Sequence, residues 1–240
     1  MRHLLSLQDL TGDEISDLLD AAQALRPIAL TRSAYRPLEG ITVANLFFEP
    51  STRTRASFQL AAQRLGADVL NFDADSSSTR KGETLTDTLR NLEAMGASLF
   101  VVRHTHSNVL SSLATSAANT SHVVSAGDGR HSHPTQGLLD MLTIRQHKGE
   151  DFSKLSVAIV GDIRHSRVAR SDVEALKALG VKDLRLTAPN SLLPDKDEAC
   201  FKDTQIVPTL DQALDGCDVI MMLRLQRERM DEGLVSSLEE

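Results

Sequence analysis

A repeated alternation of short apolar runs and helical segments constrains the fold of this chain more than any other feature of its sequence. Apolar runs with strand character cover residues 41–48, 68–72, 98–103, 122–127, 155–162, 183–189 and 218–225. Helical patterns lie between or beside them, over residues 11–25, 51–65, 82–96, 108–117, 134–149, 166–180 and 210–216. Strands that alternate with helices form parallel sheets covered by helices. The sequence therefore predicts an α/β fold with mostly parallel sheets and helices on both faces.

A polar stretch at residues 146–154 separates the first run of alternation from the second. We therefore expect two domains, residues 1–145 and 146–240, with a substrate cleft between them at the carboxyl ends of the strands.

The net charge of −7 argues against nucleic-acid or membrane partners. Two cysteines without metal-binding spacing fit a reducing cytoplasm.

The segment after the first strand, Ser51-Thr52-Arg53-Thr54-Arg55, opens a helix and is rich in hydrogen-bond donors. Free backbone N–H groups and the positive helix end favour a bound anion at such a position. Cations in the first turn oppose the helix dipole by about 0.3–1 kcal/mol each, a penalty that a bound phosphate would reverse. The alternative is an ordinary N-cap serine with solvated arginines.

Two further helix starts carry chemistry. Ser166 and Arg167 begin a helix after a buried strand, with Ser166 as the expected N-cap, and could form a second anion site. His133 precedes Pro134 at a helix start, where the positive helix end favours a neutral imidazole that donates to a carbonyl oxygen. Gln136 follows on the same turn. The alternative for His133 is a capping role alone.

Other candidate residues lie at strand ends or in a polar loop. Arg103 ends one predicted strand, and Arg224 and Gln226 end another. Lys81 lies in a serine-rich loop, for which a solvated basic turn is the alternative interpretation. The histidines lack metal-ligand spacing, and we expect no metal or organic cofactor. The chain is acidic overall, yet several arginines lie at the predicted strand ends. This pattern predicts a substrate with several negative charges.

These residues resemble the catalytic chains of the aspartate carbamoyltransferase family. The similar segments are FFEPSTRTRASF, RKGETLTDT, VVRH, AGDGRHSHPTQGLLDMLTI, VAIVGDIRHSRVARS and LRLQRER, in this order along nearly the whole chain. HPTQ, the Lys-Gly-Glu-Thr loop and Arg-x-Gln favour the aspartate branch over the ornithine branch. The resemblance implies carbamoyl transfer from carbamoyl phosphate to the amine of L-aspartate, a step in pyrimidine biosynthesis.

The resemblance also implies a role for each candidate residue. The carbamoyl-phosphate site would contain Ser51, Thr52, Arg53, Thr54, Arg103, His133 and Gln136, with Arg53, Thr54, Arg103 and His133 catalytic. The aspartate site would contain Lys81, Arg167, Arg224 and Gln226. Ser77 and Lys81 would come from a neighbouring subunit of a homotrimer. Residues 1–145 would then bind carbamoyl phosphate and residues 146–240 aspartate.

Members of the family run well beyond residue 240, so we expect the C-terminal part of the second domain to be missing from this chain. Ser125 also differs from the asparagine of many relatives. The alternative function is therefore a catalytically incompetent binding or assembly subunit of the same fold. The sequence leaves open whether regulatory or dihydroorotase-like chains attach.

Overall fold

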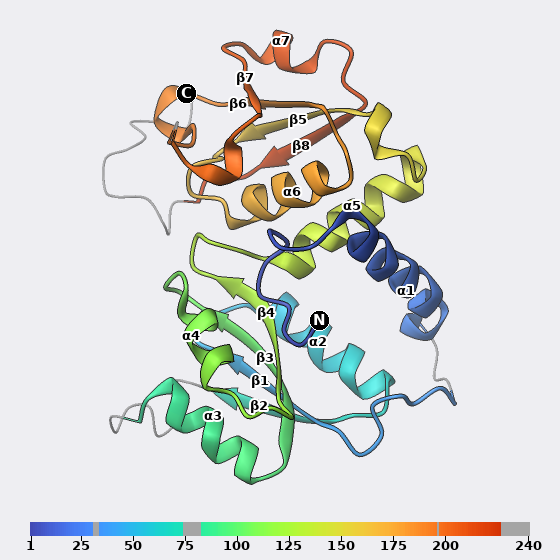
Figure 1. Ribbon diagram of the computed structural model, residues 1–240, viewed down its shortest axis with the longest axis vertical. Helices are drawn as coiled ribbons and strands as arrows, with labels where there is room; N and C mark the ends of the chain where they lie inside the picture. The colour runs from blue at the N-terminus through green and yellow to red at the C-terminus, as the bar shows by residue number, and fades with distance from the viewer. Residues whose placement is uncertain (31–33, 74–82, 196, 227–240) are drawn as a thin grey trace. The chain divides into compact units, whose positions relative to one another are not determined.

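The computed structural model of the protein describes residues 1–30, 34–73, 83–195 and 197–226 (Figure 1). The chain folds into two compact units. The first unit contains Met1–Ser6 and Ala21–Thr135, and the second contains Leu7–Asp20 and Gln136–Glu240. Helices α1 (Gly12–Leu30) and α5 (Pro134–Lys148) each contribute residues to both units. The sequence-based boundary at residue 145 lies in α5, whereas these units divide at the first turn of that helix.

The first unit is built on a four-stranded parallel sheet with the strand order β2-β1-β3-β4. Its strands are β1 (Thr42–Phe47), β2 (Asp68–Asp73), β3 (Ala97–His104) and β4 (His122–Asp128). Its helices are α2 (Thr52–Arg64), α3 (Leu85–Ala94) and α4 (Val109–Ser116). Helix α2 covers one face of the sheet, while α3 and α4 cover the other (Figure 1).

Alternation of side chains along β1 explains why both faces of this sheet are covered. Val43 and Phe47 pack with Ala62 of α2 on one face. Ala44 and Leu46 belong to the core cluster that α3 and α4 complete on the other. Successive residues of a strand point to opposite faces, so a strand that is apolar at consecutive positions needs a layer on each side. This is the arrangement that the uninterrupted apolar run predicted.

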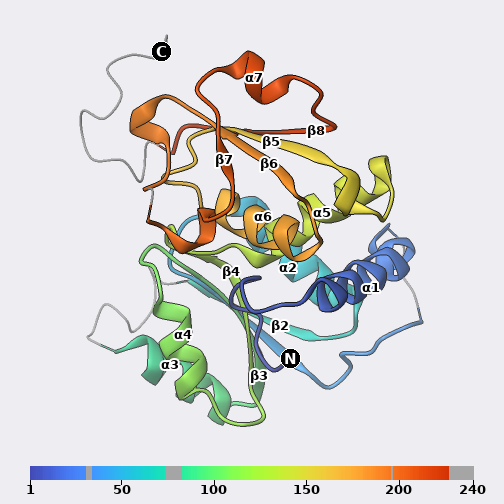
Figure 2. The same ribbon diagram turned by 45° about the horizontal axis from the view of Figure 1, so that its top comes forward.

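The second unit contains a four-stranded parallel sheet with the strand order β7-β6-β5-β8. Its strands are β5 (Ser156–Gly161), β6 (Asp183–Thr187), β7 (Gln205–Ile206) and β8 (Val219–Leu223). Helix α6 (Arg167–Ala178) and the short helix α7 (Leu210–Leu214) cover opposite faces (Figure 2). Short 3-10 helices at Phe152–Lys154, Asn190–Leu192 and Ala199–Phe201 complete the connections. The predicted two-sheet α/β fold is confirmed.

Local sequence signals set several helix starts. Thr11 and Glu14 form a reciprocal capping box at α1, in which the Thr11 backbone donates to Glu14 Oε2 at 2.9 Å and Glu14 N donates to Thr11 Oγ1 at 3.2 Å. Helix α1 runs to Leu30, beyond the predicted end at residue 25.

In the described part of the chain, no helix is long and apolar enough to cross a membrane.

Candidate active site

The start of α2 lies directly after β1, at the carboxyl edge of the first sheet. Ser51 is the N-cap residue, but in the described structure its side chain accepts no hydrogen bond from the helix backbone. Its hydroxyl donates instead to Thr54 Oγ1 at 2.8 Å. Thr52 and Arg53 are exposed, and no acidic residue lies in the first turn. A helix start whose N-cap side chain leaves the backbone N–H groups uncapped favours the anion-site interpretation over the ordinary N-cap.

Arg103 reaches the same edge from the carboxyl end of β3. Its position aligns with Phe47, and its backbone carbonyl accepts from Phe48 N at 2.8 Å. The guanidinium is buried and donates to Glu49 Oε1 at 2.6 Å and to the carbonyl of Ala126 at 3.1 Å. A buried charge requires such partners, since its desolvation is costly. The pair therefore fixes the guanidinium beside the segment that begins α2.

The segment after β4 brings His133 to the first sheet's carboxyl edge. Asp128 N donates to the Ser132 carbonyl at 2.9 Å, which closes the turn that precedes the helix. His133 is buried and immediately precedes α5, and Pro134 is the first helical residue, as predicted. Gln136 follows on the first turn and donates from Nε2 to Asp140 Oδ1 at 3.0 Å. The first unit thus brings Ser51, Thr54, Arg103 and His133 to one edge of one sheet.

The corresponding edge of the second sheet carries the start of α6. Ser166 is the N-cap residue, as predicted, and its hydroxyl accepts from Ala169 N at 3.1 Å. This cap occupies a position that is left open at α2, so the two helix starts differ as anion sites. Arg167 is buried, with only 2% of its surface exposed, and is therefore not a solvated arginine. Arg224 is exposed and donates to the Leu225 carbonyl at 3.1 Å.

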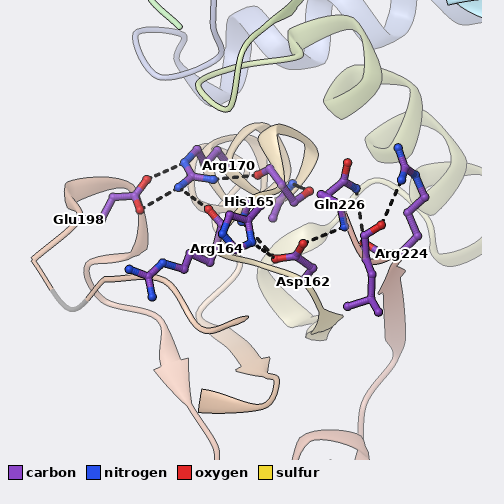
Figure 3. Close-up of polar contacts among 10 residues, drawn as sticks. Asp162, Arg164, His165, Arg170, Glu198, Arg224 and Gln226 are labelled. Carbon is purple, nitrogen blue, oxygen red and sulfur yellow. Dashed lines mark hydrogen bonds and ion pairs between the residues drawn. The ribbon is translucent and has the colours of Figure 1, made fainter. Parts of the chain in front are cut away.

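Asp162, which the sequence analysis did not identify, connects the predicted aspartate-site residues (Figure 3). It is fully buried at the end of β5. Its Oδ1 accepts from His165 N at 3.2 Å and bonds His165 Nδ1 at 2.8 Å, and its Oδ2 accepts from Gln226 N at 2.9 Å. One carboxyl group therefore joins the turn before Arg167 to the segment after β8. An acidic residue directly after a buried strand was the sequence signal that could have revealed it.

Arg170 holds the same turn from within α6, a structural role that the sequence analysis did not predict (Figure 3). It donates to the carbonyl groups of Arg164 and Ser166, each at 3.0 Å. It also binds both carboxyl oxygens of Glu198, at 2.6 and 2.9 Å, and its guanidinium lies over the Phe201 ring. A bidentate pair holds a planar guanidinium in one orientation. Arg170 is thus committed to holding the turn on which Arg167 depends.

Other sequence-based candidates lie outside the description of the structure. Ser77 and Lys81 fall within residues 74–82, which are not among the described residues. Among the residues that are described, no group of three histidine, cysteine, aspartate or glutamate side chains could hold a metal ion.

Comparison with known proteins identifies the relatives of this chain. Residues 2–146 match the family "Aspartate/ornithine carbamoyltransferase, carbamoyl-P binding domain". The catalytic subunit of aspartate carbamoyltransferase from Stenotrophomonas maltophilia strain K279a is 60% identical over 100% of this chain and 76% of the relative. The corresponding subunit from Xanthomonas euvesicatoria is 58% identical over 100% of this chain and 76% of that relative. The chain belongs to the aspartate carbamoyltransferase family.

Solved structures of the family have the same fold. Aspartate transcarbamoylase from Trypanosoma cruzi in complex with carbamoyl phosphate matches with a TM-score of 0.87 and 31% identity, over 97% of this chain and 74% of that one. The same enzyme in complex with carbamoyl phosphate and aspartate matches with a TM-score of 0.86 and 31% identity, over 95% and 74%. The resemblance to the aspartate carbamoyltransferase family is therefore confirmed.

Proposed function

We propose that the protein transfers the carbamoyl group of carbamoyl phosphate to the amine of L-aspartate, giving N-carbamoyl-L-aspartate and phosphate. The single observation that carries this proposal is the uncapped start of α2 beside the fixed guanidinium of Arg103. It offers backbone and side-chain donors to a phosphate at a sheet edge. Membership in the aspartate carbamoyltransferase family supports the choice of reaction, and pyrimidine biosynthesis as its context.

Within this proposal, residues 1–145 bind carbamoyl phosphate. The phosphate is held by Ser51, Thr52, Arg53, Thr54 and Arg103 at the start of α2 and the end of β3. Thr54, Arg103 and His133 bind the carbonyl oxygen, while Gln136 binds the carbamoyl NH2 group. The exposure of Arg53 at the helix start leaves its guanidinium accessible to a ligand.

The second group of residues binds aspartate. Arg167, Arg224 and Gln226 would bind its carboxylates, and Asp162 supports this assignment because it ties the segments that carry them. Lys81 would act at the same site, and with Ser77 it would come from a neighbouring subunit. The proposal therefore includes a homotrimer, and a cytoplasmic location that fits the free thiols of Cys200 and Cys217.

The chemistry follows from these assignments. The aspartate amine attacks the carbonyl carbon and forms a tetrahedral intermediate with negative charge on the former carbonyl oxygen. The bond to the phosphate oxygen then breaks, the carbonyl reforms, and phosphate takes up the proton that the amine loses. Each preorganised donor to the developing oxyanion contributes about 3–4 kcal/mol. Binding the two reactants in the correct orientation contributes up to about 7–11 kcal/mol more.

A colorimetric assay for carbamoyl-aspartate tests the proposal. The protein is incubated with carbamoyl phosphate and either L-aspartate or L-ornithine, and we expect product with aspartate only. Binding of carbamoyl phosphate is measured separately by calorimetry. Binding without turnover would contradict the proposed reaction and favour a binding or assembly subunit, and product from ornithine would contradict the substrate assignment.

A further inference from the structure

Asp172 of α6 is a buried carboxyl group that accepts no hydrogen bond from the described residues. The residue has no exposed surface. In the described part of the chain, neither of its side-chain oxygens receives a hydrogen bond from a donor group. An ionised carboxylate in this position would pay a large desolvation cost without compensation. The neutral, protonated acid avoids this cost and carries an O–H group that requires an acceptor.

The side chain of Asp140 on α5 is a suitable acceptor. The two carboxyl groups interact, and each raises or lowers the pKa of the other. Helices α5 and α6 approach closely at this level, because a Cβ on Gly137 would lie 3.1 Å from Ser171 Cβ. Burial, followed by the charge of Asp140, raises the pKa of Asp172 well above its usual value. Two buried carboxyl groups that interact tend to share one proton, since two like charges in a buried site disfavour double ionisation.

Asp140 also holds Gln136, one turn earlier on α5. Gln136 Nε2 donates to Asp140 Oδ1 at 3.0 Å. Residues four apart on a helix share a face, so this contact needs no distortion. The bond commits the NH2 end of the amide to Asp140. The carbonyl oxygen of Gln136 is then the end that can accept a hydrogen bond from a ligand N–H.

We propose that Asp140 and Asp172 form an acid pair that positions Gln136. The Asp172 hydroxyl donates to Asp140, and Asp140 fixes the amide so that the Gln136 carbonyl oxygen accepts from the NH2 group of carbamoyl phosphate. The inference rests on the proposed function, because the ligand of Gln136 is taken from it. Both acids are positioning residues, since they act through Gln136.

The pair predicts how carbamoyl-phosphate binding depends on pH. The charged group acting on Asp172 is Asp140, and Asp140 is acted on by Asp172 and the Gln136 amide. Loss of the shared proton at high pH places two negative charges against each other and removes the hydrogen bond that holds Asp140. We therefore expect affinity for carbamoyl phosphate to fall as the pH rises. Asp172→Asn retains a donor that does not titrate, and it should abolish this fall.

The experiment compares wild type, Asp172→Asn and Asp172→Ala with Asp195→Asn, which removes an exposed carboxylate in the same unit. KM for carbamoyl phosphate and kcat are measured from neutral to alkaline pH. We expect Asp172→Asn to match wild type at neutral pH and to remain flat at high pH, and Asp172→Ala to raise KM about tenfold. Asp195→Asn should follow wild type. An alkaline loss in Asp172→Asn equal to that of wild type would overturn the proposal.

A double-mutant cycle tests whether Asp140 acts through Gln136. We expect Asp140→Ala to raise KM in the parent protein and to have no further effect in a Gln136→Ala background. Additive effects would refute the positioning role, and circular dichroism confirms that each variant is folded.

Infrared spectroscopy provides a readout that does not require turnover. The measurement is made in a Glu174→Gln background, because the Glu174 carboxyl group, with a pKa of about 7, is also partly protonated at neutral pH. We expect a protonated carboxylic acid band in this background that is lost when Asp172→Asn is added, and no such difference would overturn the pair itself. If this band is present but wild type lacks transferase activity, the proposed function fails and the positioning role fails with it, while the shared proton remains. If wild type is active and the cycle is additive, only the positioning role fails.

Discussion

Replacement of Asp162 by asparagine is the sharpest test of how the second unit supports its sheet edge. The buried carboxyl group makes three hydrogen bonds, two to His165 and one to Gln226 N. Asparagine has the same shape but only one acceptor oxygen. If that oxygen faces His165, the new NH2 group meets the Gln226 N–H. The Gln226 N–H then loses its acceptor, and the NH2 group is a second donor without one.

The cost follows from this count of donors. A buried donor left without a partner costs about 1–3 kcal/mol, and the remaining bonds weaken because the acceptor has lost its charge. We therefore expect Asp162→Asn to lower the free energy of unfolding by about 2–5 kcal/mol. This is a large fraction of the 5–15 kcal/mol that is typical of folded proteins, yet it leaves a folded variant for assay.

Urea unfolding followed by circular dichroism measures this loss. Asp195→Asn is the matched control, because it breaks an exposed ion pair to Arg164 at 3.1 Å. Such surface pairs contribute about 0–1 kcal/mol. We also expect Asp162→Asn to raise KM for aspartate while carbamoyl-phosphate binding is retained. A stability loss no larger than that of the control would refute the role of Asp162 as the link between the two segments.

Three further predictions follow from single positions. Gly161 has φ +113°, and a Cβ there would lie 2.4 Å from a β8 carbonyl oxygen, so Gly161→Ala should lower the melting temperature far more than Gly216→Ala, which meets nothing within 4 Å. Burial raises the pKa of Glu174 from 4.5 to about 7, so the protonated form stabilises the fold and this stabilisation is lost as pH rises from 4.5 through 7. Glu174→Gln should remove that pH dependence in urea unfolding and gain up to about 3 kcal/mol above pH 7, and an unchanged slope would contradict the burial argument. Arg53→Ala should lower turnover by several orders of magnitude and leave the circular dichroism spectrum unchanged. Arg64→Ala, at the far end of α2, should leave turnover unchanged. Turnover of Arg53→Ala within about tenfold of wild type would exclude the assigned role.

The sequence by itself determined the elements and most of their ends. Apolar runs and helical periodicity located the strands and helices, because these signals depend on neighbours a few residues away. Helix starts at Thr11, Pro134 and Ser166 were readable for the same reason, since a cap bonds within its own first turn. The candidate residues at strand ends were predictable once parallel strands were inferred, because such strands end at a common edge.

The tertiary structure decided which distant residues meet. Asp162 bonds both to His165 and to Gln226, which lies 64 residues beyond Asp162, and no local pattern indicates that pairing. The contact between Asp140 and Asp172 likewise depends on the close packing of α5 against α6. Strand order and the inclusion of residues 7–20 in the second unit were also not readable from local signals. These contacts are selected by burial and hydrogen-bond satisfaction over the whole unit, and a free energy shared among distant segments leaves no periodic trace in the sequence.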